Sequence, residues 1–230
     1  MSRVIDYVLQ DSVLVSYPKS GRTWLRMIMA KLLDIKGFDI FKKEFMPAAH
    51  HEPRKSLVVF GEDKKVIFLH RDIGDVLSSY YAEKSTSDRS GTRYNGTTSE
   101  FIRNKNLGVD NAINFNKKWF HQASKNDKVK IVSYEELQEN TCLAVRGIVD
   151  FLGFECSDME IEEATLYSRF ENMVQIEKGE GINLLSNYKG NFGKSKGRVR
   201  RGKVGGYKED FSEKDIEFIN ERKKILNYDY

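Results

Sequence analysis

The sequence predicts an α/β fold in three layers, with a central parallel sheet covered by helices on both faces. Residues 13–15, 65–69 and 129–133 are short apolar, β-branched runs of the kind found in strands buried on both sides. A segment with the spacing of an amphipathic helix follows each run. Strands that alternate with helices favour parallel pairing, because the helices supply the crossover connections.

The size and composition of the chain suit a globular protein. Its 230 residues are enough for one α/β core, so we expect residues 1–230 to form a single domain. The hydrophobic fraction of 40% and the charged fraction of 31% exclude a disordered chain. The net charge of +4 gives no general signal for a polyanionic partner, although residues 178–208 are rich in Gly, Lys and Arg.

Two further features bear on redox chemistry and location. Cys142 and Cys156 lack the spacing of metal ligands, so we expect them to be reduced thiols. Residues 1–15 lack the apolar segment of a signal peptide, and no run of about twenty apolar residues occurs. We therefore expect a cytoplasmic protein whose partners include neither a membrane nor a nucleic acid.

The other elements follow from periodicity and capping residues. Asp72 and Ser212 are expected to cap two of the helices. Residues 46–53 allow a short strand that runs into a loop, and the polar, aperiodic residues 85–99 predict a loop that forms a lid or a wall of an acceptor site. Helical spacing predicts helices over residues 23–33, 73–84, 109–124, 143–152 and 213–226, with shorter ones from residue 134 and within 158–177.

Charged and aromatic side chains follow the three predicted strands. Lys19, Arg71 and Tyr134 each come at or just after the carboxyl end of one strand. Ligands of open parallel sheets bind beyond these ends, which share one edge of the sheet. The pattern therefore predicts a crevice that binds an anion.

The turn after the first strand is the strongest part of this pattern. Residues 19–23, Lys-Ser-Gly-Arg-Thr, lead into a helix, so unpaired backbone N–H groups face outward at the positive end of its dipole. Gly21 allows close approach of a phosphate, and Lys19 adds a mobile charge. A nucleoside-triphosphate P-loop places its lysine after a glycine, whereas here the lysine comes first. The alternative is a simple strand–turn–helix corner with an exposed lysine.

Residues 17–24, Tyr-Pro-Lys-Ser-Gly-Arg-Thr-Trp, resemble the 5′-phosphosulfate loop of the sulfotransferases, YPKSGTTW, and depart from it at Arg22. These enzymes use 3′-phosphoadenosine 5′-phosphosulfate (PAPS) and release 3′-phosphoadenosine 5′-phosphate (PAP). The resemblance implies a PAPS-binding fold, related to that of P-loop proteins, and a donor site that contains the loop. The loop residues it assigns to the donor are Lys19, Ser20, Gly21, Arg22, Thr23 and Trp24.

A second segment, residues 71–81, resembles the family's 3′-phosphate motif RNPKDVAVSYY. Arg71 and Ser79 occupy its two phosphate-contacting positions, and a guanidinium at a strand end suits phosphate because it forms forked, charge-assisted hydrogen bonds. Asp72 and Ile73 replace the Asn and Pro of the motif, and a carboxylate beside the arginine is unfavourable unless it caps the helix. The alternative is an arginine paired with Asp75.

A third segment, residues 200–208, resembles the family's RKGxxGDWK. The resemblance places Arg200, Arg201 and Gly202 at the 3′-phosphate, with Gly206 and Tyr207 in place of Asp and Trp. Because the segment is rich in glycine, we expect it to be mobile until the nucleotide binds. A solvated loop or a weak nucleic-acid patch is the alternative.

The resemblance also suggests residues for the adenine. Trp24 matches the family's stacking tryptophan, and Tyr134 matches the tyrosine of its YEDL-like segment. Residues 168–173 resemble an SFxxM segment, which places Ser168 and Phe170 at the base. Each aromatic side chain could instead belong to the core.

The family's catalytic histidine lies at a strand end between the two phosphate motifs, where this chain has His50 and His51. The Glu that follows His51 is closer to the family pattern, so we assign His51 as the base that accepts the acceptor's proton. Surface loop histidines are the alternative. We interpret His70 as structural and expect His121 on a helix face.

These assignments imply in-line sulfuryl transfer from PAPS to a hydroxyl or an amine, with Lys19 and His51 as catalytic residues and no metal ion. The acceptor class left open is a small molecule or a carbohydrate. A P-loop kinase and a nucleic-acid-binding module are the competing interpretations. The family's dimer segment KxxxTVxxxE would fall at residues 208–217, where Ser-Glu replaces Thr-Val, so the oligomeric state stays open.

Overall fold

The computed structural model of the chain describes residues 12–37, 48–49, 64–86, 93–180, 184 and 202–230. Its sheet contains four parallel strands in the order β2-β1-β3-β4. The short strand that residues 46–53 allowed is present as β2, and the other three predicted strands are confirmed. Their bounds are β1 (Ser12–Ser16), β2 (Ala48–Ala49), β3 (Lys65–His70) and β4 (Val129–Ser133).

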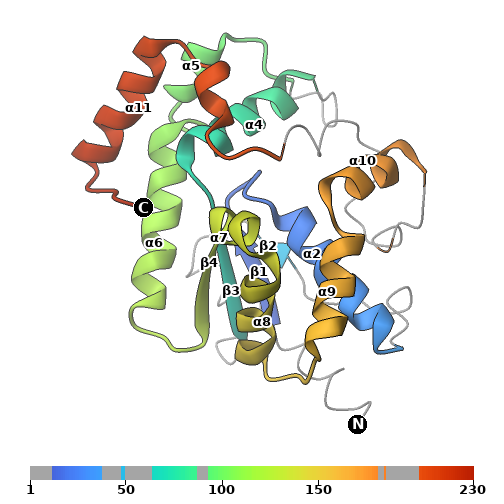
Figure 1. Cartoon of the computed structure of the whole chain (residues 1–230). Coiled ribbons are helices and arrows are strands. Elements are labelled where there is room, and N and C mark those ends of the chain that lie inside the picture. Colours follow the sequence, from blue (N-terminus) through green and yellow to red (C-terminus); the bar gives the residue numbers. More distant parts are fainter. Residues whose placement is uncertain (1–11, 38–47, 50–63, 87–92, 181–183, 185–201) are drawn as a thin grey trace.

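Helices cover both faces of the sheet, which confirms the three-layer prediction (Figure 1). Alternate residues of β1 point to opposite faces, because Leu14 belongs to one hydrophobic core while Val13 and Val15 belong to the other. On the face of Leu14 lie α2 (Arg22–Ile35), α7 (Tyr134–Glu139), α8 (Thr141–Leu152), α9 (Asp158–Tyr167) and α10 (Phe170–Lys178). On the other lie α4 (Ile73–Thr86), α5 (Thr98–Ile102), α6 (Val109–Ala123) and α11 (Glu213–Ile225).

The two cores differ in composition. The core between the sheet and α2 is mainly aliphatic, and α2 is buried almost all around rather than along one stripe. The core between the sheet and α6 is aromatic, with the Phe68 ring stacked on Trp119 at a centroid distance of 5.9 Å. The sheet is thus held from both sides, which fixes the edge where its strands end.

Side-chain caps set several helix boundaries. Asp72 Oδ1 accepts a hydrogen bond from the Asp75 N–H at 3.1 Å, and Ser212 Oγ accepts one from the Asp215 N–H at 3.3 Å, so both expected caps are confirmed. Helix α5 was not predicted, although Thr97 and Glu100 form a capping box at its start. A short 3₁₀ turn, η1 (Gly206–Glu209), was also missed.

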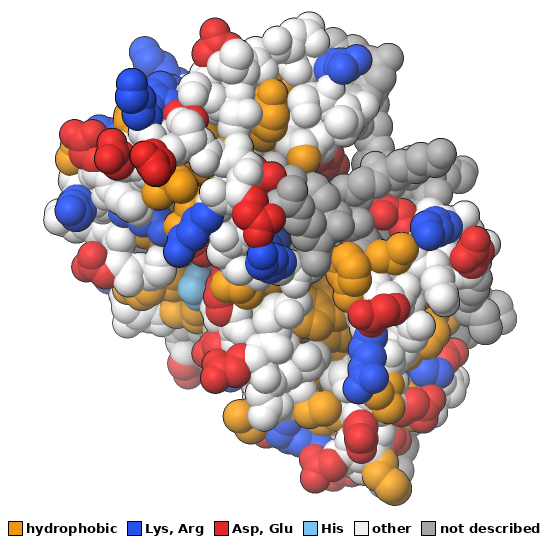
Figure 2. Space-filling view, turned by 45° about the horizontal axis from the view of Figure 1, so that its top comes forward, with side chains coloured by type: hydrophobic (Ala, Val, Ile, Leu, Met, Phe, Trp, Pro, Cys, Tyr) orange, Lys and Arg blue, Asp and Glu red, His pale blue; other side chains and the backbone are white. Residues whose placement is uncertain are grey.

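The surface carries intermixed charges. Figure 2 shows acidic and basic side chains side by side on the face that it presents. Within the described ranges, no helix is long and apolar enough to cross a bilayer, and no group of three or more metal-ligand side chains occurs. Cys142 is an exposed thiol and Cys156 a half-buried one.

Candidate active site

The predicted phosphate loop connects the end of β1 at Ser16 to the start of α2 at Arg22. Lys19 and Gly21 have φ angles of 71° and 95°, both in the left-handed region. Glycine adopts this conformation freely, whereas for Lys19 it costs on the order of 1 kcal/mol, a kind of strain that concentrates at functional sites. The first turn of α2 has neither an acidic residue nor a side-chain cap, and the positive end of a helix dipole favours an anion.

Gly21 is required here because it packs against an aromatic ring. A Cβ atom at this position would lie 2.5 Å from Cδ2 of Tyr134. The Tyr134 ring is buried, packs edge-on against Trp24 at 5.6 Å, and its hydroxyl accepts a hydrogen bond from Gln138 at 3.0 Å. The first residue of α7, Tyr134, therefore packs against the loop, and its role at the adenine stays a prediction.

We expect Gly21→Ala to lower the free energy of unfolding by about 2–3 kcal/mol, because it adds a clash to an unfavourable φ angle. Gly37→Ala is the matched control, since Gly37 has a φ of 77° but no atom of the described residues, apart from its chain neighbours, within 4 Å of its Cβ position. It should cost only about 1 kcal/mol. Urea unfolding of both variants measures the difference, and equal losses would show that the Tyr134 contact is unimportant.

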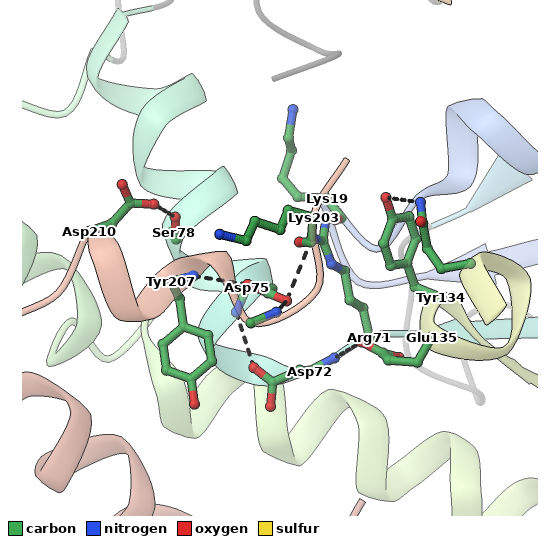
Figure 3. A network of polar contacts seen from close by, with 12 residues as sticks. Lys19, Arg71, Asp72, Asp75, Ser78, Tyr134, Glu135, Lys203, Tyr207 and Asp210 are labelled. Carbon is green, nitrogen blue, oxygen red and sulfur yellow. Dashed lines mark hydrogen bonds and ion pairs between the residues drawn. The ribbon is translucent and has the colours of Figure 1, made fainter. Parts of the chain in front are cut away.

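Arg71 lies directly after β3 and is held on several sides (Figure 3). Its guanidinium lies 4.1 Å from the centre of the Tyr134 ring and donates hydrogen bonds to the carbonyls of Lys203 at 3.0 Å and Lys19 at 3.5 Å. It also pairs with Asp75 at 3.7 Å, so the alternative ion pair exists. That pair leaves the Nε atom of Arg71 buried without a partner, which keeps a donor for a ligand.

Asp75 joins the C-terminal segment to this arginine. Its carboxylate accepts hydrogen bonds from the N–H groups of Gly205 at 2.7 Å and Tyr207 at 3.0 Å. Residues 202–207 therefore lie against the start of α4, next to Arg71, as Figure 3 shows for Lys203 and Tyr207. The sequence suggests Asp75 only as an alternative ion-pair partner that would occupy Arg71 in place of a phosphate.

The structure also brings Gly202 to Phe170. A Cβ atom on Gly202 would lie 2.7 Å from the Phe170 ring, which is 37% exposed at the start of α10. Ser168 is fully buried at the end of α9, two residues earlier. Arg200 and Arg201 lie outside the described residues.

Lys19 and Ser79 approach the site from different elements. Lys19 Nζ pairs with Glu83 of α4 at 3.6 Å, which sequence reasoning did not foresee. Ser79 lies one helical turn before Glu83 and so shares its face of α4, the face toward the loop. Arg22, Thr23 and Trp24 form the half-buried first turn of α2.

Within the described part of the chain, several buried polar atoms have no hydrogen-bond partner. Ser20 Oγ, Ser168 Oγ and Arg71 Nε are all fully enclosed without a hydrogen bond, and Ser16 Oγ at the end of β1 is in the same state. An unsatisfied buried polar group costs about 1–3 kcal/mol, so native proteins retain such groups mainly where they serve a purpose. Asn116 Oδ1 shares this property but lies on α6, away from the loop. Ser16, Ser20 and Arg71 lie where β1 and β3 end, and their unpartnered atoms fit a polar ligand at this edge.

The predicted base lies outside the described residues, as does His50. Strand β2 ends at Ala49, which pairs with Val15 of β1. The chain therefore leaves β2 at the same edge as the phosphate loop, one residue before His50 and two before His51. This connectivity agrees with the assignment of His51 but leaves it a prediction.

His70 and His121 lie elsewhere. The His70 ring packs edge-on against Phe120 at 5.0 Å and lies 5.9 Å from Phe68, in keeping with a structural role. Burial lowers the pKa of His70 to about 4. His121 is exposed on α6.

The lowered pKa of His70 makes stability depend on pH. Between pH 6.5 and about 4 the unfolded chain binds a proton that the folded chain does not, so stability falls as the pH falls through this window. At pH 4 the cost reaches about 3 kcal/mol. We expect His70→Phe to remove this part of the acid dependence in urea unfolding, while His121→Gln keeps the wild-type slope. If the stability of His70→Phe falls with pH as steeply as that of the wild type, this acid dependence does not come from His70.

The class of protein follows from comparison with known families. The model of the sulfotransferase domain matches residues 42–225, which is most of the chain. The chain therefore belongs to the sulfotransferase family and is a sulfotransferase by class, which disfavours the kinase interpretation. The matched range begins after the phosphate loop, so the loop is an independent point of agreement.

Individual relatives agree over most of their length. Sulfotransferase 2A1 of Rattus norvegicus is 27% identical over 234 residues, covering 88% of this chain and 79% of its own. Cytosolic sulfotransferase 13 of Arabidopsis thaliana is 24% identical and covers 96% and 78%. Sulfotransferase 1E1 of Bos taurus is 26% identical and covers 71% and 65%. The chain thus spans between 65% and 79% of the length of these relatives.

Solved structures show the same fold. Mouse sulfotransferase SULT7A1, complexed with PAP, superposes with a TM-score of 0.76 at 19% identity over 94% of this chain and 83% of its own. Retinol dehydratase, in complex with androsterone and the inactive cofactor PAP, gives 0.69 at 16% identity over 96% and 82%. The three-layer architecture is therefore that of the sulfotransferases.

Proposed function

We propose that this chain transfers the sulfuryl group of PAPS to a hydroxyl or amine of an acceptor. The observation that supports this most is the meeting of Lys19 and Arg71 with the unpartnered buried hydroxyls of Ser16 and Ser20 at one edge of the sheet. The PAP present in both solved relatives supports the same donor for this chain.

The donor site is divided between two phosphate positions. The N–H groups of the loop, with Ser20 and Thr23, would hold the 5′-phosphate, and Lys19 would face the bridging oxygen. Arg71 and Ser79, with Arg200, Arg201 and Gly202, would hold the 3′-phosphate. The residues that would surround the adenine are Trp24, Tyr134, Ser168 and Phe170, and Arg22 would line the loop.

In the reaction, a lone pair of the acceptor oxygen or nitrogen forms a bond to sulfur. The bond between sulfur and the bridging oxygen breaks, and its electron pair stays on the 5′-phosphate of PAP. His51 takes the acceptor's proton. Lys19 and the loop N–H groups stabilise the charge that grows on the bridging oxygen. The chain performs this step by positioning and electrostatics, with no metal ion in the scheme.

A small-molecule acceptor is supported by the retinol dehydratase structure, which holds androsterone, while a carbohydrate stays the second candidate. A cytoplasmic location is likewise a proposal, supported by the naming of the plant relative as cytosolic. The predicted ordering of residues 200–208 on nucleotide binding can be checked by hydrogen exchange with and without PAP.

The function is tested by incubating the chain with PAPS carrying labelled sulfate and a panel of phenols, alcohols, amines and sugars. We expect label on at least one class in the presence of a metal chelator. Transfer from ATP that requires magnesium, with none from PAPS, would instead identify a kinase.

A further inference from the structure

Asp72, the residue after Arg71, carries a negative charge next to the proposed 3′-phosphate position. Asp72 stands where the motif that this segment resembles has an uncharged Asn, and its carboxylate is one residue from Arg71. At 0.15 M salt the Debye length is about 8 Å, so a charge on the neighbouring residue acts on a phosphate held by that arginine. A bare carboxylate here would repel the 3′-phosphate.

The two oxygens of Asp72 are both engaged. Oδ1 accepts the hydrogen bond from the Asp75 N–H that starts α4, at 3.1 Å, as Figure 3 shows. Oδ2 lies 2.8 Å from Nζ of Lys223, which comes from α11. Both side chains of this ion pair are partly buried, with exposed fractions of 26% for Asp72 and 18% for Lys223. The pair is thus partly shielded from solvent, and the attraction between two charges is stronger where water screens it less.

Two further acids, Asp75 and Glu135, lie near Arg71 and Asp72 and have different partners. Asp75 accepts two backbone N–H groups from residues 205 and 207 and lies 3.7 Å from Arg71 itself. The Glu135 carboxylate accepts the Asp72 N–H at 3.0 Å and does not balance the charge of Asp72. The cation that the structure places on Asp72 is therefore the one on α11.

We propose that Lys223 is a positioning residue of the nucleotide site, which cancels the charge of Asp72 so that Arg71 can hold a 3′-phosphate. The inference rests on the proposed function. It makes the C-terminal helix part of the donor site through the charge of Lys223 on Asp72.

The test uses the full-length chain and two nucleotides that differ only in the 3′-phosphate, PAP and adenosine 5′-monophosphate. Calorimetry should show that Lys223→Met weakens PAP about 5- to 20-fold but changes the monophosphate less than about 2-fold. High salt should reduce the PAP effect, because it screens the carboxylate that the variant leaves without its cation.

Rescue by a second substitution separates charge from structure. Asp72→Asn keeps the cap of α4, since Asn caps as well as Asp, and removes the charge. The double variant Asp72→Asn/Lys223→Met should bind PAP within about 2-fold of Asp72→Asn alone. Arg222→Met is the control for docking of α11, because Arg222 holds this helix to Asp110 at 2.7 and 2.8 Å. It should leave the PAP affinity as in the wild type.

Four outcomes would overturn the inference. If Asp72→Asn does not rescue, Lys223 contacts the nucleotide or acts in another way. If both nucleotides weaken equally, or Arg222→Met weakens PAP as much, Lys223 only docks the helix. If Lys223→Met binds PAP normally, the pair is irrelevant. Failure of the wild-type chain to bind PAP would instead refute the proposed function.

Discussion

Replacement of Lys19 by Ala is expected to lower the turnover of sulfuryl transfer by about 10²- to 10³-fold, the usual effect of removing one group that stabilises transition-state charge. Nucleotide binding should weaken much less, by about 10-fold at most, because the loop N–H groups and Arg71 remain. The fold should persist, since alanine tolerates the left-handed conformation at position 19 about as well as lysine does. Steady-state kinetics and calorimetry with PAP measure the two effects separately.

Lys31→Ala is the matched control for this variant. Lys31 is also a half-buried, paired lysine of the same strand–helix unit, with Asp34 at 3.1 Å and Glu163 at 3.2 Å, but it lies near the far end of α2. It should leave turnover unchanged. Full activity of Lys19→Ala, or an equal loss in Lys31→Ala, would remove Lys19 from the catalytic role.

Replacement of Arg71 by Met is expected to weaken PAP about 100-fold, because it removes charge-assisted hydrogen bonds worth about 1.5–3 kcal/mol each. Methionine keeps apolar bulk over the Tyr134 ring, so the loss should fall on binding rather than on packing. Adenosine 5′-monophosphate should weaken far less, since it lacks the 3′-phosphate. Arg71→Lys should bind PAP more weakly than the wild type and more tightly than Arg71→Met, because lysine keeps the positive charge but lacks the paired donors of a guanidinium.

Arg103→Met controls for the general effect of losing a paired arginine. Arg103 resembles Arg71 in its contacts, with its guanidinium 4.3 Å from the Phe218 ring and 2.6 Å from Asp215, but it ties α5 to α11. It should lower thermal stability and leave the PAP affinity intact. Equal affinity for PAP in Arg71→Met and the wild type would place the 3′-phosphate elsewhere.

The sheet and the approach of the strand ends were predictable because they depend on local signals. Buried β-branched runs specify the strands, and parallel pairing then brings Lys19, Arg71 and Tyr134 to one edge. Helix α5 was predictable too, because its capping box is visible in the sequence, but its first residues fell within a segment interpreted as a loop.

The charge network around the site could not be predicted, because its members are far apart in the chain. Asp72 and Lys223 are 151 positions apart, and Asp75 bonds to residues 205 and 207. Neither spacing follows a helical or strand period, so only the packing of α11 and of residues 202–207 on α4 reveals them. The ion pair between Glu83 of α4 and Lys19 could not be predicted for the same reason, because the helix and the loop are far apart in the sequence.

Gly21 has a second role in the fold besides the one that the sequence indicates. The sequence indicates a glycine that lets a phosphate approach the backbone. The structure adds that its left-handed conformation and the Tyr134 ring already exclude a side chain there. The glycine therefore serves packing as well as binding, a distinction that no local pattern carries.

Calorimetric titration of the wild-type chain with PAP tests the central claim most directly, because the claim is that the corner between β1 and α2, together with Arg71, holds an adenosine bisphosphate. We expect saturable heat with one nucleotide bound per chain. Absence of heat at nucleotide concentrations up to about 1 mM would contradict the account, because a dissociation constant of 1 mM corresponds to a binding free energy of only about −4 kcal/mol.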